Sequence, residues 1–507
     1  MPEVSVFRSL FAICFAFFLA LSWRDSRAQL PAMGDGAEMT AGAERQLGER
    51  IVRELYRDPD YIDDAVLAEY VQGTWQPLLA AARVRGELPP ELDDRFAWEI
   101  LLGRDRTVNA FALPGGYLGL HLGLIGTVTS RDELASVLAH ELSHVTQRHI
   151  PRLMAKQSRQ APWMLGAMVL GALAASKNPE LANAVMVGGQ AVAAQNQLNF
   201  SRDMEREADR IGYGLMTQAG FAPRGFVSMF EKLQQASRLN DNGSFPYLRS
   251  HPLTTERIAD MQARQPLGAP HAALAAPVME HSMIAARARV LSNPGVDLLR
   301  SWVAEPETTG FATFSAARRA GVLYAAALAS ERLREPARAE ALVRQLLLLT
   351  AGDAASARQA RLLAAEIALA AGDVPQAGRT LGPDPGNTPA ARPEVLLRAQ
   401  IHLRTGQPAR AVDLLRTWVA GHPRDASAWQ ALAAAYGAQD APLQAIRAAG
   451  EVQMARLDYA GAVDRFKAAR DFQGKSGPMP ADHIEASIID TRLRLAESLL
   501  REQLLER

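Results

Sequence analysis

The sequence predicts a mainly α-helical protein in two parts: an α+β domain with a small β-sheet, followed by an α-helical solenoid of short repeats. Three observations support this prediction. Apolar residues recur at helical spacing over most of the 507 residues. Short strand-like runs lie between residues 96 and 122. From about residue 284 the helical pattern repeats with a 34-residue period, which is typical of tetratricopeptide repeats.

The first 28 residues are typical of a secretory signal peptide. Arg8 precedes an apolar core from Leu10 to Trp23, and Ser26-Arg27-Ala28 supplies small residues around a cleavage site. We expect cleavage after Ala28 and export to a bacterial periplasm; an uncleaved anchor is the alternative. Cys14 is the only cysteine and lies in the apolar core, so disulfides do not stabilise the mature chain.

Composition excludes some functions. The 55 basic and 55 acidic residues cancel, which gives no support to nucleic-acid binding. Beyond the signal segment, no apolar run reaches the roughly 20 residues of a membrane-spanning helix. At 48% hydrophobic residues, the chain can bury substantial cores.

Residues 29–264 form the predicted α+β domain. Helical spacing over 43–84 is broken in two by Asp58-Pro59. Strands are expected over 96–102, 108–113 and 117–122, with Pro114-Gly115-Gly116 as the turn between the last two.

A helix is expected next, from about 131 to 152. Ser130 with Glu133 three residues later forms a capping box at its start.

This helix carries the motif His140-Glu141-Leu142-Ser143-His144. Two histidines four residues apart lie on one helical face, one turn apart, and can bind one Zn²⁺. Glu141 is then placed to act as general base on an attacking water. The pattern predicts a zinc-dependent hydrolase with one Zn²⁺ per chain.

Zinc needs a third protein ligand, and the charge cluster 201–210 is the best source. Glu205 and Glu207 compete for this role; they are about 200° apart on a helix, so at most one faces the metal. His149 follows His144 by five residues, about 140° around a continuous helix, and should point away from the metal. We assign it a structural or ligand-supporting role.

The flanking segments leave alternatives open. Residues 162–194 are apolar and interrupted by Asn178-Pro179. We expect a buried helical hairpin, and the alternative is a mobile cover over the site or a surface that touches a membrane or a client. His121 is interpreted as a surface or cleft-lining residue, and Arg257 as a salt-bridge partner.

A linker is expected over 265–283 and the repeats over 284–507. Gly372 and Gly406 stand 34 residues apart, as do Pro408-Ala409-Arg410-Ala411 and Pro442-Leu443-Gln444-Ala445. Trp429, Leu432 and Tyr436 fit the first helix of a tetratricopeptide repeat. About four degenerate repeats are expected; a plain helical bundle is the alternative.

The motif at 140–144, followed by Ser201-Arg202-Asp203-Met204-Glu205-Arg206-Glu207-Ala208-Asp209, resembles the HtpX-like zinc metallopeptidase family. The resemblance implies a zincin-type fold with Glu205 as third ligand and with Asp209 either orienting a histidine or holding the helices together. The segment Asn109-Ala110-Phe111-Ala112-Leu113 looks like the family's strand beside the active-site helix and would bind an extended substrate by edge pairing.

His251 lies in Ser250-His251-Pro252, a stretch that also resembles the family. It could stabilise the tetrahedral intermediate, or take the water's position on the metal and hold the site latent. A capping or packing histidine is the structural alternative.

The signal peptide and repeats resemble periplasmic family members that act on outer-membrane protein assembly. The resemblance implies an endopeptidase that degrades misassembled clients, with partners in the assembly machinery bound through the repeats. The alternative is a chaperone-like assembly factor whose zinc site is latent or structural.

Overall fold

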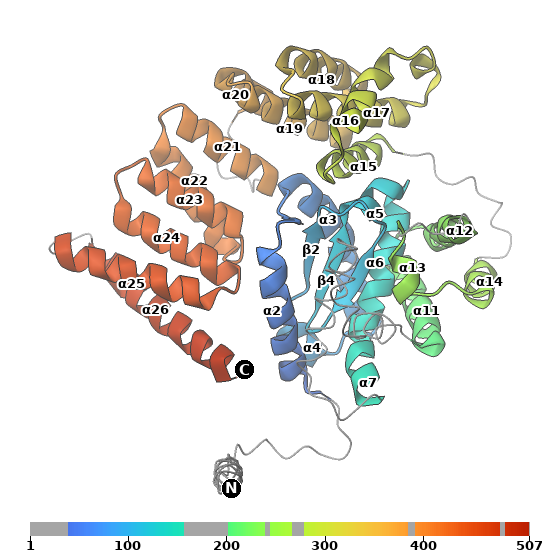
Figure 1. Cartoon of the computed structure of the whole chain (residues 1–507), viewed down its shortest axis with the longest axis horizontal. Coiled ribbons are helices and arrows are strands. Elements are labelled where there is room, and N and C mark those ends of the chain that lie inside the picture. Colours follow the sequence, from blue (N-terminus) through green and yellow to red (C-terminus); the bar gives the residue numbers. More distant parts are fainter. Residues whose placement is uncertain are drawn as a thin grey trace, which may run out of the picture. The chain divides into compact units, whose positions relative to one another are not determined.

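The computed structural model describes residues 39–156, 201–238, 244–265, 278–383, 391–476 and 482–505. The predicted signal peptide and the apolar segment 162–194 lie outside these residues. Figure 1 shows an α+β part in blue to green and a helical part in yellow to red, which confirms the predicted fold class.

Two helices open the α+β part, as expected. They are α2 (Ala41–Arg57) and α3 (Ala65–Val84), and they begin at the side-chain caps Thr40 and Asp64. The break at Asp58-Pro59 separates them and leaves room for a two-residue strand, β1 (Tyr61–Ile62), that the apolar pattern did not predict. A short helix, α4 (Pro90–Arg95), leads into the sheet.

The sheet has the order β1-β2-β4-β3. Strand β2 (Glu99–Gly103) runs parallel to β4 (Tyr117–His121), and β3 (Ala110–Leu113) pairs antiparallel with β4 at the edge of the sheet. Strands β2, β3 and β4 each lie within the range predicted from the sequence or within one residue of it. Gly115 and Gly116 both adopt positive φ in the β3–β4 turn, a conformation that favours glycine.

The helices that follow the sheet build the domain core. They are α5 (Leu122–Thr127), α6 (Arg131–Thr146), α7 (His149–Lys156), α11 (Arg202–Gln218), α12 (Arg224–Arg238), α13 (Tyr247–Ser250) and α14 (Thr255–Ala263).

Helix α6 lies at the centre of this core, in contact with α3, α11, α12 and β3. Gly212 lets α11 approach closely, because a Cβ there would stand 3.1 Å from the backbone of Ala139. The charged segment 201–210 is therefore held against helix α6, which carries the His140–His144 motif.

The single helix expected over 131–152 is two helices in the structure. The predicted helix over 131–152 ends at Thr146, and α7 begins at His149, because Arg148 adopts φ 50° and interrupts the helical path. Helix α15 begins at Met279, within the segment expected as linker, and packs against α5, α3 and α17.

Helix pairs with short turns make up the remainder. The helices are α15 (Met279–Leu291), α16 (Val296–Ala304), α17 (Ala316–Arg332), α18 (Pro336–Thr350), α19 (Ala354–Ala370), α20 (Val374–Leu381), α21 (Arg392–Arg404), α22 (Pro408–Gly421), α23 (Ala426–Gly437), α24 (Pro442–Ala455), α25 (Tyr459–Ser476) and α26 (Asp482–Leu505).

The sequence period recurs in this array. Gly372 and Gly406 both adopt positive φ just after a helix, and Pro408 and Pro442 each begin one. Within the stretches that the structure describes, no helix combines the length and apolar character needed to span a bilayer.

Candidate metal centre

The motif helix α6 is fixed at its start. The hydroxyl of Ser130 accepts from the Glu133 backbone N–H at 3.1 Å, so Ser130 caps the helix as predicted. The Glu133 carboxylate reaches back to the Thr129 N–H at 2.6 Å and also pairs with Lys232. Residues 133–146 are buried, so packing holds the motif side chains still.

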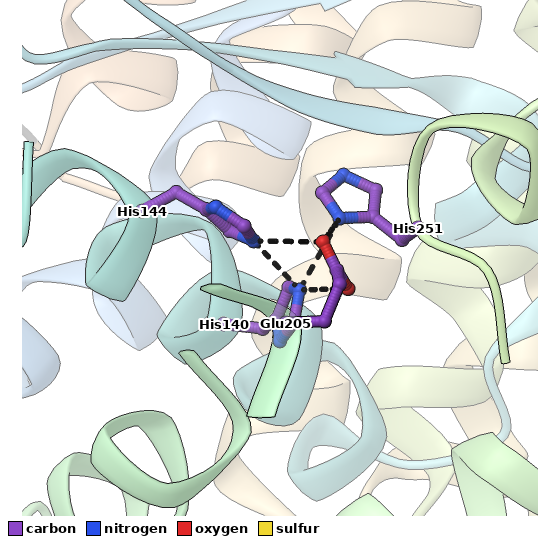
Figure 2. A group of neighbouring side chains, drawn as sticks. All are labelled: His140, His144, Glu205 and His251. Carbon is purple, nitrogen blue, oxygen red and sulfur yellow. Dashed lines mark hydrogen bonds and ion pairs between the residues drawn. The ribbon is translucent and has the colours of Figure 1, made fainter. Parts of the chain in front are cut away.

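Four buried side chains converge beside this helix: His140, His144, Glu205 and His251. Figure 2 shows the two α6 histidines pointing toward the Glu205 carboxylate and the His251 ring, which come from α11 and from the turn after α13. One ligand atom from each lies within 4.8 Å of the others. Among the described residues, no other group of this kind gathers.

The separations suit a small tetrahedral metal ion. The Nε2 atoms of His140 and His144 are 3.0 Å apart, and each lies 3.4–3.5 Å from a Glu205 oxygen. Ligands about 2.0–2.2 Å from one ion in tetrahedral geometry stand roughly 3.3–3.6 Å from one another. Burial lowers the pKa of His144 well below its usual value, which favours the neutral form of this ring.

Helix α11 separates the two competing glutamates. Its cap Ser201 accepts from the Met204 N–H, and the first turn aims Glu205 at the histidines. Glu207 lies elsewhere: its Oε2 accepts from His149 at 3.0 Å and from Arg152 at 2.9 Å. The geometry therefore agrees with Glu205, and not Glu207, as the metal-facing carboxylate.

Asp209 lies one turn after Glu205 on α11 and contacts the His140 ring. Its Oδ1 lies 2.9 Å from His140 Nδ1, and both its oxygens accept from Arg257, at 2.6 and 2.8 Å. Burial alone would raise the pKa of Asp209, but the Arg257 guanidinium holds it below its usual value. Burial would likewise lower the pKa of His140, yet the bonds to Asp209 and Glu205 raise it to about 9.

His149 does not point away from the site as a continuous helix would require. The break at Arg148 turns it back, so that His149 Nδ1 lies 2.9 Å from His144 Nδ1. The ring is fully buried, and burial lowers its pKa to about 4.

Glu141 lies between the ligand group and the edge strand. Its side chain is fully buried, and its Oε2 accepts from the Ala112 N–H at 2.9 Å. In the β3–β4 register, Asn109 accepts from His121 of β4, so the backbone groups of Ala110 and Ala112 point away from β4 by alternation. The predicted segment 109–113 thus passes directly beside the predicted general base.

His251 ends the short helix α13 and is nearly fully buried. Its Nδ1 lies 3.3 Å from His140 Nε2 and 3.0 Å from Glu205 Oε1, while its Nε2 lies 3.5 Å from Glu141 Oε1. The Tyr247 ring stacks on it with centroids 4.6 Å apart. Tyr247 was not singled out from the sequence; its position four residues before His251 is the one available signal.

His121 stands apart from the ligand group. It is 5% exposed, bonds to Thr107, and lines a small pocket with Asp58, Asp60 and Asp105. It is therefore a cleft-lining residue and not a surface one.

Comparisons with known proteins match the part of the chain that contains His140, His144, Glu205 and His251. The model of Peptidase family M48 matches residues 71–265, and a tetratricopeptide repeat model matches residues 392–435.

Individual relatives cover most of the chain. A protein of Vibrio cholerae, provisionally named a beta-barrel assembly-enhancing protease, is 33% identical over 67% of this chain and 68% of its own. The beta-barrel assembly-enhancing protease of Escherichia coli is 29% identical over 87% of each chain. The mitochondrial metalloendopeptidase OMA1 of Arabidopsis thaliana is 34% identical over 32% of this chain and 30% of its own.

Proposed function

The chain belongs to the beta-barrel assembly-enhancing proteases of peptidase family M48, and from this premise we propose that it is a periplasmic zinc endopeptidase that degrades misassembled outer-membrane proteins. The observation that carries the proposal is the buried group of His140, His144 and Glu205 with Glu141 beside it. A purely structural metal site has no use for such a carboxylate.

The donor set favours zinc over other metals. Two imidazoles and one carboxylate are a common ligand set of catalytic zinc sites, whereas Mg²⁺ and Ca²⁺ prefer sites made of oxygen ligands. A Zn²⁺ ion held by His140, His144 and Glu205 would supply Lewis-acid chemistry, because zinc lowers the pKa of water toward about 7 and polarises a carbonyl.

The chain's own residues carry the proton steps. Glu141 takes the proton of the attacking water and passes it to the leaving amine. The Ala112 N–H fixes one carboxylate oxygen and leaves the other for this transfer. His140 is oriented by Asp209, which in turn is held by Arg257.

Substrate binding falls to the edge strand. The outward backbone groups of Ala110 and the outward carbonyl of Ala112 can pair with an extended polypeptide, since the Ala112 N–H already donates to Glu141. Main-chain pairing of this kind is largely insensitive to sequence. Such recognition suits clients that share an unfolded segment and not a side-chain motif. Asn109, Phe111 and Leu113 hold the strand in register with β4.

His251 supports a latent resting state. Its Nδ1 stands among the ligand atoms, where an attacking water would have to bind. This geometry favours the second candidate function as well: an assembly factor whose repeats bind partners while its peptidase site stays closed.

The repeats are the proposed partner surface, because a solenoid of helix pairs offers an extended face to other proteins. We place the protease domain at 29–264 and the repeats after the linker, with the signal peptide removed after Ala28. N-terminal sequencing of the exported protein checks that cleavage.

The test is Glu141→Gln in the full chain, which keeps size and shape but removes the base. Cleavage of an unfolded outer-membrane protein should stop, while metal content by mass spectrometry and the melting temperature stay unchanged. Persistent cleavage would refute the mechanism. Full rescue of a deletion strain by the variant would favour the assembly-factor function instead.

A further inference from the structure

A hydrogen-bonded chain leads from the metal centre to the protein surface. His144 Nδ1 lies 2.9 Å from His149 Nδ1, and His149 Nε2 lies 3.0 Å from Glu207 Oε2. Both histidine side chains are fully buried, whereas Glu207 is 30% exposed and pairs with Arg152. His149, Glu207 and Arg152 take no part in the proton steps proposed for Glu141.

The backbone conformation at Arg148 makes this series of hydrogen bonds possible. On a continuous helix His149 would lie about 140° from His144 and could not reach it. Arg148 takes the left-handed conformation that non-glycine residues avoid at a cost of about 1 kcal/mol or more. Its guanidinium is held 3.1 Å from the buried carboxylate of Glu44. The left-handed turn at Arg148 is thus held by an ion pair with a buried carboxylate, and it is this turn that brings His149 to His144.

The hydrogen-bond partners determine which nitrogen of His149 and of His144 carries a hydrogen. A carboxylate oxygen accepts, so His149 Nε2 carries the hydrogen that Glu207 receives. Nδ1 of a neutral His149 then has no hydrogen and must accept from His144 Nδ1. His144 therefore presents a bare Nε2 to the ligand group, which is the tautomer that a metal requires.

Helix α11 supplies three carboxylates with three separate tasks. Glu205 faces the ligand atoms directly, and Asp209 contacts His140 directly. Glu207 is about 200° from Glu205 around the helix and cannot reach a ligand by itself. It reaches His144 only because the turn at Arg148 brings His149 between them.

We propose that Glu207 is a positioning residue which, through His149, fixes the tautomer and ring orientation of His144 as a metal ligand. The inference rests on the proposed metal site. It assigns Glu207 a role that neither the motif nor the ligand spacing supplies.

The test measures Zn²⁺ affinity of the full chain by competition with a chromophoric chelator. Glu207→Ala should weaken binding about 10- to 100-fold. Glu207→Gln keeps an oxygen that accepts from His149 and should weaken binding by no more than about threefold. With Co²⁺ as probe ion, the visible absorption bands should shift in the alanine variant and remain in place in the glutamine variant.

Arg152→Ala is the matched control, because it removes the other partner of Glu207 without touching His149. It should leave Zn²⁺ affinity unchanged. Equal weakening by Arg152→Ala and Glu207→Ala would overturn the proposal, since helix docking would then explain both. Wild-type affinity in Glu207→Ala would also overturn it.

Glu205→Gln separates this failure from failure of the metal site itself. If Glu205→Gln loses the metal while Glu207→Ala binds normally, the site stands and the positioning role is refuted. If Glu205→Gln also binds normally, the proposed site is refuted, and the positioning role with it.

Discussion

Arg287 donates to both carboxylate oxygens of Asp64, at 2.8 and 2.6 Å, across 223 positions of the sequence. Asp64 caps α3 of the α+β part, and Arg287 lies on α15, after the predicted linker. The same guanidinium also pairs with Glu366 of α19. It therefore joins the protease domain to two helices of the repeat array.

The pattern recurs with other arginines. Arg358 bridges Glu69 of α3 and Glu394 of α21, and Arg392 bridges Asp63 and Asp425. Each arginine lies in the repeat array and each contacts an acidic residue at or near the start of α3. The two parts are therefore joined by charge pairs as well as by apolar packing.

Arg287→Met should destabilise the protein by about 3 kcal/mol, because the partly buried carboxylates of Asp64 and Glu366 lose their shared cationic partner. The measurement is chemical denaturation of the full chain. Arg344→Ala is the control: its pair with Glu340 is more than 60% exposed on both sides, so little change is expected. Equal effects of the two substitutions would contradict a special role for Arg287.

The Arg392 bridge should fail in acid. Burial would raise the pKa of Asp425, but Arg392 holds it below its usual value. A depressed folded-state pKa gives stability above the unfolded-state pKa of about 3.9, and this stability is lost as the pH falls through the folded-state value. The difference in unfolding free energy between wild type and Asp425→Asn should therefore shrink toward zero below about pH 4.

Asparagine can still cap α23, so Asp425→Asn isolates the charge. Asp203→Asn provides the control, because Asp203 is 89% exposed and its partner Arg206 lies on the same helix. A pH-independent difference for Asp425→Asn would show that the charge pair contributes nothing.

Local pattern was enough for the part of the motif helix that carries the histidines and for three of the four strands. The spacing of His140 and His144, the cap at Ser130 and the turn at Gly115-Gly116 each depend on residues within a few positions, and the structure places all of them as predicted.

What the sequence could not supply depends on backbone conformation or distant contacts. The residue type of Arg148 does not indicate a positive φ, so His149 was expected to point away from the metal. Glu207 was considered only as a competing ligand, and its contact with His149 was not predicted. Arg287 and Asp64 are 223 positions apart, and no local sequence pattern around either residue indicates that they pair.

Glu205→Gln should abolish stoichiometric metal binding, because the amide lacks the negative charge that stabilises a divalent cation in a buried site. Metal content of the purified full chain is the measurement. Glu256→Gln is a suitable control, since Glu256 is 69% exposed on α14. One metal per chain in the Glu205 variant would assign the third ligand to another residue.

His251→Ala should activate the peptidase. Its Nδ1 lies 3.3 Å from His140 Nε2, where it competes with the attacking water, while His140, His144 and Glu205 remain to hold the metal. A closed state favoured by about 1.4 kcal/mol corresponds to a tenfold rise in cleavage rate on release. Cleavage of an unfolded protein is compared with that of His422→Ala, whose histidine is exposed on the repeats. Loss of cleavage with metal retained would instead assign His251 to stabilising the transition state.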